Sequence, residues 1–171
     1  GKVAIVPGGC TKIGRAVVDA FVAAGTKVMV GDIAPGEGFA PEVGFQSCDL
    51  RDDAQIAALV AATKDRFGRI DFLVNVACSY LDNGAASTRA EWLESLNVNV
   101  VGSVMLMQAA EAELAATRGA IVNFGSISSR VAQTGRWLYP VSKAAILQLT
   151  RNQAMDLAPK GIRVNAVSPG W

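Results

Sequence analysis

Short apolar segments alternate along the chain with longer segments whose apolar residues recur at helical spacing, and no other feature restricts the fold as much. The short segments predict strands over Lys2–Val6, Lys27–Val30, Val43–Cys48, Phe72–Val76, Ala120–Phe124 and Ile162–Val167. The longer segments predict helices over Ile13–Ala24, Asp52–Phe67, Arg89–Thr117 (as one helix) and Tyr139–Ala158. Strands that are apolar on both faces need helices on both sides of their sheet. The pattern therefore predicts an α/β fold, a doubly wound parallel sheet in a single domain over residues 1–171.

Composition narrows the class of protein. The chain has 171 residues, 51% of them hydrophobic, which suits one domain with a core and argues against a disordered chain. The net charge of +1 favours neither a nucleic-acid nor a membrane partner, and no apolar segment is long enough to span a membrane. Without histidine, a histidine-based triad or histidine-ligated metal is excluded, and we expect no metal site. Three cysteines make no disulfide framework, so we expect a cytoplasmic location.

A glycine-rich turn, Pro7–Gly14, joins the first expected strand to the first expected helix. Such a turn lets backbone N–H groups and the positive helix end face a pyrophosphate, as in a Rossmann-type dinucleotide site. Spacing alone leaves open a helix-entry loop without a ligand. Asp32 ends the second strand, where an acidic residue hydrogen-bonds the adenosine ribose and repels a 2′-phosphate. The turn and Asp32 together favour NAD over NADP, although Asp32 can also be a plain turn residue.

Further motifs follow in a fixed order along the chain. They are Asp49-Leu50, Asn75-Val76-Ala77-Cys78, Asn99 before Gly102, Ser126, Tyr139-x-x-x-Lys143 and Pro169-Gly170. Tyr-x-x-x-Lys alone arises easily by chance, whereas the ordered combination does not. With the glycine-rich turn and Asp32, this combination resembles the short-chain dehydrogenase/reductase family over the whole chain.

The resemblance implies an NAD(H)-dependent oxidoreductase that interconverts a secondary alcohol and a ketone by hydride transfer. The catalytic residues it implies are Asn99, Ser126, Tyr139 and Lys143. The cofactor-binding residues it implies are Gly8, Lys12, Ile13, Gly14, Asp32, Asp49, Leu50, Asn75, Ala77, Tyr139, Lys143, Pro169 and Gly170. It also implies a homodimer or homotetramer and a small-molecule alcohol or ketone as substrate, whose identity the sequence does not define.

Tyr139 and Lys143 are four residues apart, so on a helix they share one face. A free tyrosine is a poor base at neutral pH, and a nearby ammonium favours the phenolate form. The resemblance implies that Tyr139 is the acid or base and that Lys143 also contacts the nicotinamide ribose. It further implies that Ser126 binds the substrate oxygen and that Asn99 holds a water for proton relay. The alternatives are a surface pair for Tyr139 and Lys143, a loop cap for Ser126, and Asn97 in place of Asn99.

Four positions depart from the family pattern. Lys12 replaces the middle glycine of the turn, where a side chain can crowd the pyrophosphate, pair with a phosphate, or strain the turn if φ is positive. Pro7 replaces a threonine, and Val76 and Cys78 replace an asparagine and a glycine after the fourth strand. We expect an altered loop and weaker cofactor binding. A nucleotide-binding or scaffold protein without turnover is therefore the alternative function.

The family continues past Pro169-Gly170 into a substrate-binding segment and a seventh strand. The sequence ends at Trp171, and we expect the fold without those two elements.

Overall fold

One six-stranded sheet organises the computed structural model, which describes residues 1–170. Its strands are β1 (Val3–Pro7), β2 (Lys27–Asp32), β3 (Val43–Ser47), β4 (Phe72–Asn75), β5 (Ala120–Phe124) and β6 (Arg163–Val167). The spatial order is β3-β2-β1-β4-β5-β6, and every neighbouring pair is parallel. The predicted doubly wound, Rossmann-type parallel sheet is thereby confirmed.

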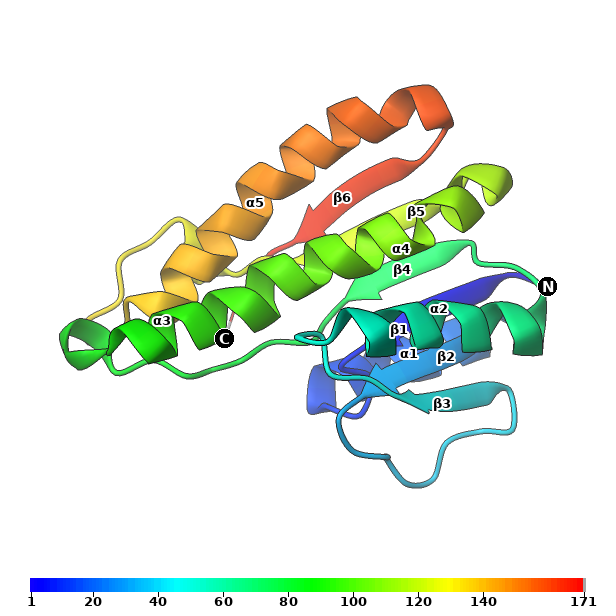
Figure 1. Cartoon of the computed structure of the whole chain (residues 1–171), viewed down its shortest axis with the longest axis horizontal. Helices are drawn as coiled ribbons and strands as arrows, with labels where there is room; N and C mark the ends of the chain where they lie inside the picture. The colour runs from blue at the N-terminus through cyan, green and yellow to red at the C-terminus, as the bar shows by residue number, and fades with distance from the viewer. Residues whose placement is uncertain (171) are drawn as a thin grey trace.

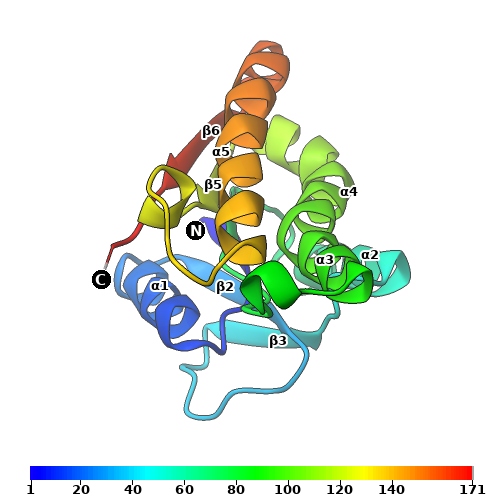
Figure 2. The ribbon, with the colours of Figure 1, turned by 90° about the vertical axis from the view of Figure 1, so that its left-hand side faces the viewer.

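Helices cover both faces of the sheet. They are α1 (Lys12–Ala23), α2 (Asp53–Phe67), α3 (Arg89–Leu96), α4 (Gly102–Thr117) and α5 (Leu138–Leu157), with short 3-10 turns η1 (Gly84–Ala86), η3 (Ile127–Ser129) and η4 (Ala158–Lys160). Helix α1 lies on one side of the sheet, and α2, α4 and α5 lie on the other (Figure 1 and Figure 2). Successive side chains of β1 point to opposite faces of the sheet and so contribute to the core on both sides. Ile5 packs into the core beneath α2 and α4, whereas Ala4 and Val6 pack with Val18 of α1.

The prediction of one unbroken α-helix over Arg89–Thr117 is wrong. A π-helical turn, η2 (Asn97–Val101), separates α3 from α4. The buried Asn99 side chain in this turn bonds to the neighbouring segment at Ser79. Gly102 begins α4 so close to the loop between β3 and α2 that a Cβ there would lie 2.6 Å from the Leu50 carbonyl oxygen. The π turn, which is wider than an α-helical turn, is therefore held by contacts with distant segments. Such π turns often occur at functional sites.

The other predicted element ends agree with the structure or differ from it by at most two residues. Helix α5, for example, begins at Leu138 and ends at Leu157, and β2 continues to Asp32. None of the helices within residues 1–170 is both long and apolar enough to cross a membrane.

The turn between β1 and α1 depends on a close backbone approach. Gly8 has φ +77° and its carbonyl oxygen accepts a hydrogen bond from Thr11 Oγ1 at 2.8 Å. Thr11 caps α1, because Oγ1 also accepts from the Gly14 N–H at 3.1 Å. A Cβ at Gly14 would lie 2.0 Å from the Gly8 carbonyl oxygen. The helix can therefore start against the turn only because Gly14 has no side chain.

Gly14→Ala tests this packing. We expect a loss of about 3 kcal/mol in the free energy of unfolding, because backbone on both sides of the turn must shift. Gly25→Ala is the matched control, since Gly25 has φ +74° but no atom within 4 Å of a Cβ. It should cost only the left-handed strain of about 1–2 kcal/mol. Equal losses for the two variants in urea unfolding would contradict this account of Gly14.

Candidate active site

Two adjoining cavities lie at the carboxyl ends of the strands, near β1, where the strand order reverses between β2-β3 on one side and β4-β5-β6 on the other. We call them the tyrosine cavity, of about 400 Å³, and the aspartate cavity, of about 330 Å³. Thr11 and Cys78 line both. In open parallel sheets, ligands bind in the crevice at this reversal of strand order. The pair of cavities is therefore the candidate active site.

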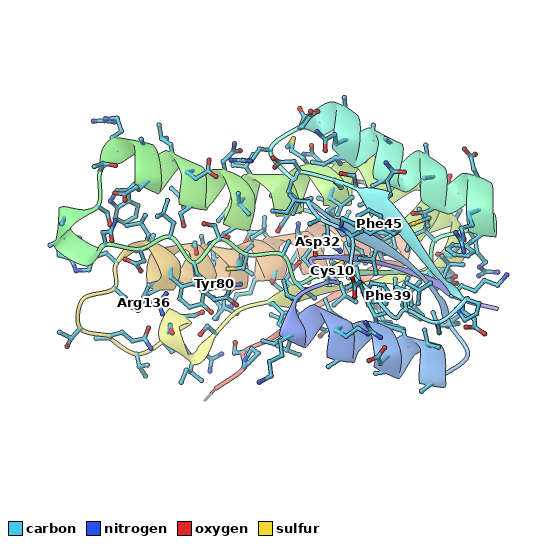
Figure 3. All side chains as sticks on the ribbon, turned by 90° about the horizontal axis from the view of Figure 1, so that it is seen from below. Cys10, Asp32, Phe39, Phe45, Tyr80 and Arg136 are labelled. Carbon is cyan, nitrogen blue, oxygen red and sulfur yellow. The ribbon has the colours of Figure 1, made fainter. Side chains whose placement is uncertain are left out.

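The aspartate cavity contains the residues expected to bind the adenosine half of a dinucleotide. Its lining includes Gly8, Asp32, Asp49, Leu50 and Ala77. The Cys10 N–H donates to Asp32 Oδ2 at 3.0 Å, and the Ile33 N–H donates to Oδ1 at 2.9 Å. Figure 3 shows Asp32 beside Cys10 near the middle of the molecule. The turn and the strand end thus hold the carboxylate in one orientation, each oxygen keeping a free lone pair.

Arg51 also lines the aspartate cavity and was not identified from the sequence. Its guanidinium pairs with Asp49 Oδ2 at 2.5 Å and with Glu94 Oε1 at 2.6 Å. The hydrogen bond from Arg51 lowers the pKa of Asp49 below its ordinary value. Two carboxylates therefore balance the Arg51 cation, and the cavity carries no unpaired positive charge at this point.

The tyrosine cavity gathers most of the remaining expected residues. Its lining includes Lys12, Ile13, Ser126, Tyr139, Lys143, Pro169 and Gly170. Tyr139 and Lys143 occupy the first turns of α5, and Ser126 precedes η3 at the end of β5. The fold thus brings together three residues that stand in separate motifs of the sequence.

Lys143 is a buried cation, 5% exposed. Its Nζ donates a hydrogen bond to the Phe124 carbonyl oxygen at 2.8 Å and lies 5.7 Å from the centroid of the Tyr139 ring. A buried ammonium is stable only where polar partners replace water. The carbonyl at the end of β5 supplies one such partner and holds the ammonium beside the tyrosine.

Ser126 combines a capping role with its place in the cavity. Its Oγ accepts from the Ser128 N–H at 3.1 Å and contacts Ser128 Oγ at 3.0 Å. The loop-cap alternative for Ser126 is therefore observed, and the same hydroxyl lines the tyrosine cavity.

Two aromatic or cationic neighbours of Tyr139 were missed by the sequence analysis. The Tyr80 ring stacks on the Tyr139 ring at 5.4 Å between centroids, and Arg136 Cζ lies 4.8 Å from the Tyr139 centroid. Figure 3 shows Tyr80 and Arg136 together toward one end of the molecule. Neither residue belongs to a local motif, so only their position in space relates them to the site.

Asp82 caps the helix that carries Tyr139 and was also missed. Its side chain is 1% exposed and accepts hydrogen bonds from the N–H groups of Trp137 at 2.9 Å, Tyr139 at 3.0 Å and Gly84 at 3.0 Å. Burial alone would raise the pKa of Asp82, but these backbone donors outweigh it and lower the pKa. A negative charge also suits the positive end of α5. Asp82 therefore fixes the position of Tyr139 from a segment far away in sequence.

Three expected residues lie behind the cavities instead of lining them. Gly14 packs against the turn, and Asn75 donates to Asn123 Oδ1 at 2.8 Å inside a buried polar cluster. Asn99 Nδ2 donates to the Ser79 carbonyl and to Ser142 Oγ, both at 3.0 Å. The side-chain amide of Asn99 is thus engaged with protein, and the relay water expected there stays a prediction.

The departures from the family pattern leave the turn connected to its neighbours. The Ala77 N–H donates to the Pro7 carbonyl oxygen at 2.9 Å, so backbone joins the segment after β4 to the turn. Lys12 is the first residue of α1 and does not have positive φ, so the strain considered for it is not present. Burial raises the pKa of the Cys78 thiol, which nearby Lys143 only partly opposes. The thiol is therefore protonated at neutral pH.

No group of three or more His, Cys, Asp or Glu side chains within residues 1–170 is placed to hold a metal ion.

Known proteins share both the sequence pattern and the fold. A family model described as "Enoyl-(Acyl carrier protein) reductase" matches residues 10–171. The chain is 36% identical to sorbitol dehydrogenase of Cereibacter sphaeroides, covering 99% of the chain and 70% of that protein. It is 32% identical to L-fucose dehydrogenase of Bos taurus, in an alignment that covers 99% of the chain and 66% of that protein. The solved structure of Thermoplasma acidophilum aldohexose dehydrogenase superimposes with a TM-score of 0.92 at 31% identity, covering 99% and 66%.

The chain belongs to the short-chain dehydrogenase/reductase family. It spans about two thirds of the length of these relatives. Their names support an oxidoreductase that acts on CH–OH groups.

Asp82→Asn tests the cap of α5. We expect a loss of about 2–3 kcal/mol in the free energy of unfolding at pH 7, because an uncharged amide leaves buried N–H donors poorly satisfied. Since folding lowers the pKa of Asp82, its stabilisation is complete above the unfolded value near 3.9 and is lost as pH falls through the folded value. The difference between wild type and variant, measured by urea unfolding, should therefore shrink at acidic pH.

Asp19→Asn is the control for Asp82. Asp19 pairs with Arg15 on the exposed surface of α1, so its loss should cost no more than about 0.5 kcal/mol. A similar small cost for Asp82→Asn would show that the cap contributes little.

Proposed function

We propose that the protein is an NAD(H)-dependent oxidoreductase that interconverts a secondary alcohol and a ketone, with Tyr139 as acid and base. The observation that carries the proposal is that Ser126, Tyr139 and Lys143 line one cavity, which adjoins the cavity of Asp32. The three relatives described above are named as dehydrogenases of sugars or a sugar alcohol, and these names support the same reaction class.

The residues around the turn fit a dinucleotide. No acceptor within residues 1–170 receives a hydrogen bond from the backbone N–H groups of Lys12 and Ile13, which open α1 at the tyrosine cavity. Such free donors at a helix start suit a pyrophosphate, and the Lys12 ammonium adds a positive charge there. In this proposal Asp32 binds the adenosine ribose, Asp49 and Leu50 face the adenine, and Pro169-Gly170 borders the nicotinamide end.

The protein supplies position and proton transfer. When bound, the nicotinamide cofactor supplies the hydride acceptor or donor. Tyr139 takes the hydroxyl proton of an alcohol in oxidation and returns a proton to the oxygen in reduction. The Phe124 carbonyl holds the Lys143 ammonium 5.7 Å from the centroid of the Tyr139 ring, so a positive charge lies beside the residue that transfers the proton. Ser126 Oγ hydrogen-bonds the substrate oxygen and stabilises the charge that develops on it.

Tyr139→Phe tests the assignment of the acid and base. The variant keeps the ring that stacks on Tyr80 but loses the proton-transferring hydroxyl. We expect kcat to fall at least about 10²-fold for alcohol oxidation, which is the usual size of an acid–base contribution. NADH binding, followed by fluorescence, should stay within about twofold of wild type because the ring remains in place. Turnover equal to wild type would refute the mechanism.

Asp32 should set the choice of cofactor. A 2′-phosphate would approach the fixed Asp32 carboxylate, and Arg51 is already paired with Asp49 and Glu94. We expect NADH to bind at least about tenfold more tightly than NADPH in fluorescence titrations, because like charges repel. Asp32→Asn, which keeps an oxygen acceptor for Cys10, should bring the two affinities close together. Tighter binding of NADPH by wild type would show that the choice of NAD is wrong.

A nucleotide-binding or scaffold protein without turnover stays the alternative. Saturable NADH binding without oxidation of any alcohol in a broad panel would favour it. Self-association into a dimer or tetramer stays a prediction.

A further inference from the structure

The tyrosine cavity is cationic. Lys12, Arg136 and Lys143 line it, and no Asp or Glu of the described chain does so. Two of these cations already have a structural or proposed binding role. Lys12 lies at the start of α1 beside the proposed pyrophosphate site, and Lys143 Nζ donates to the Phe124 carbonyl. Arg136 is the one of these three cations that has no role in the proposed reaction.

The guanidinium of Arg136 has free donors. Arg136 Nε forms an ion pair with the buried Asp82 Oδ2 at 3.7 Å, a distance that is too long for a hydrogen bond. Both Asp82 oxygens already accept backbone N–H groups. No oxygen within residues 1–170 accepts a hydrogen bond from the Arg136 side chain, which is 33% exposed. Its planar set of donors is therefore available to a carboxylate that enters the cavity.

Arg136 lies next to the reacting group. Its Cζ is 4.8 Å from the centroid of the Tyr139 ring, and Tyr80 stacks on that ring at 5.4 Å. Figure 3 shows Arg136 and Tyr80 close together and away from Asp32. An anionic group bound by Arg136 would therefore belong to a molecule whose hydroxyl reaches Tyr139, and not to the adenosine half of a cofactor.

We infer that Arg136 binds the carboxylate of the substrate, so that the substrate class is a short hydroxy acid and the corresponding keto acid. This inference rests on the proposed function and deepens it. The carbinol C–H bond breaks and its electron pair leaves as hydride to NAD, the hydroxyl proton goes to Tyr139, and the carboxylate is unchanged. A carboxylate paired with Arg136 in this partly buried cavity orients the carbinol toward Tyr139 and Ser126.

The test compares acids with uncharged analogues. We would measure kcat/KM of the full chain for lactate and 3-hydroxybutanoate, each against its methyl ester. Wild type should prefer the acids at least about tenfold. Arg136→Gln should lose about 10- to 100-fold on the acids, the range for a lost charged hydrogen bond, and less than about threefold on the esters. Arg136→Lys, which keeps the charge but not the planar donor set, should fall between the two.

Arg130→Gln is the matched control. Arg130 is an exposed arginine of the same connecting segment that lines neither cavity, so the acid-to-ester ratio should stay at the wild-type value. Equal losses on acids and esters in Arg136→Gln would show that Arg136 only supports Tyr139, and would overturn the inference. So would a wild type that uses the esters as well as the acids.

A binding measurement separates this inference from the proposed function. With NAD present, which cannot reduce them, pyruvate and acetoacetate should raise the melting temperature of wild type but not of Arg136→Gln. Such a shift without any turnover would support the carboxylate site while contradicting the proposed oxidoreductase. Turnover of neutral alcohols with no shift by either keto acid would leave the oxidoreductase intact and overturn the carboxylate site.

Discussion

The parallel pairing of β1 with both β2 and β4 is the constraint on which the site depends. Ile5 of β1 is in register with Met29 on one side and Leu73 on the other, and all three are buried. β1 is central and buried on both faces, so helices must cover both sides of the sheet beside it. The crossovers on its two sides then run in opposite directions and leave a crevice. Both cavities lie there, so the hydrophobic core determines where the chemistry can occur.

Two helix caps align the halves of the site within this frame. Thr11 caps α1 with the help of the close contact between Gly14 and Gly8, and so directs the start of that helix toward the cavities. Asp82 caps α5 and holds the backbone of Tyr139. In each case one side chain satisfies N–H groups that the helix leaves free. The same caps therefore stabilise the fold and place the groups proposed to bind phosphate and to transfer a proton.

The residues that depart from the family pattern do not disrupt the glycine-rich turn, because a backbone hydrogen bond holds the turn to the segment after β4. Where Pro7 and Val76 lack polar side chains, the Ala77 N–H bonds to the Pro7 carbonyl and Val76 packs in the core facing α1. Lys12 enters α1 without positive φ. These substitutions leave the turn in place and add a cation beside it. Lys12, Arg136 and Lys143 together give the tyrosine cavity the positive charge on which the proposed preference for a carboxylate depends.

The sequence by itself determined the order of strands and helices and the glycine-rich turn, because periodicity and short motifs are local properties of the chain. The family resemblance implied Ser126, Tyr139 and Lys143 as catalytic residues, and the fold brings them to one cavity. Strand β5 was predicted with its observed bounds. Tertiary structure decided the π turn at Asn99, the cap from Asp82 and the position of Arg136 beside Tyr139. Each of these depends on contacts with segments distant in sequence or on a loop whose path only packing defines. The partners of Asn99 and Asp82 lie far away in sequence, so no local pattern reveals these contacts. Arg136 precedes Tyr139 by only three residues, but it belongs to no recognised motif.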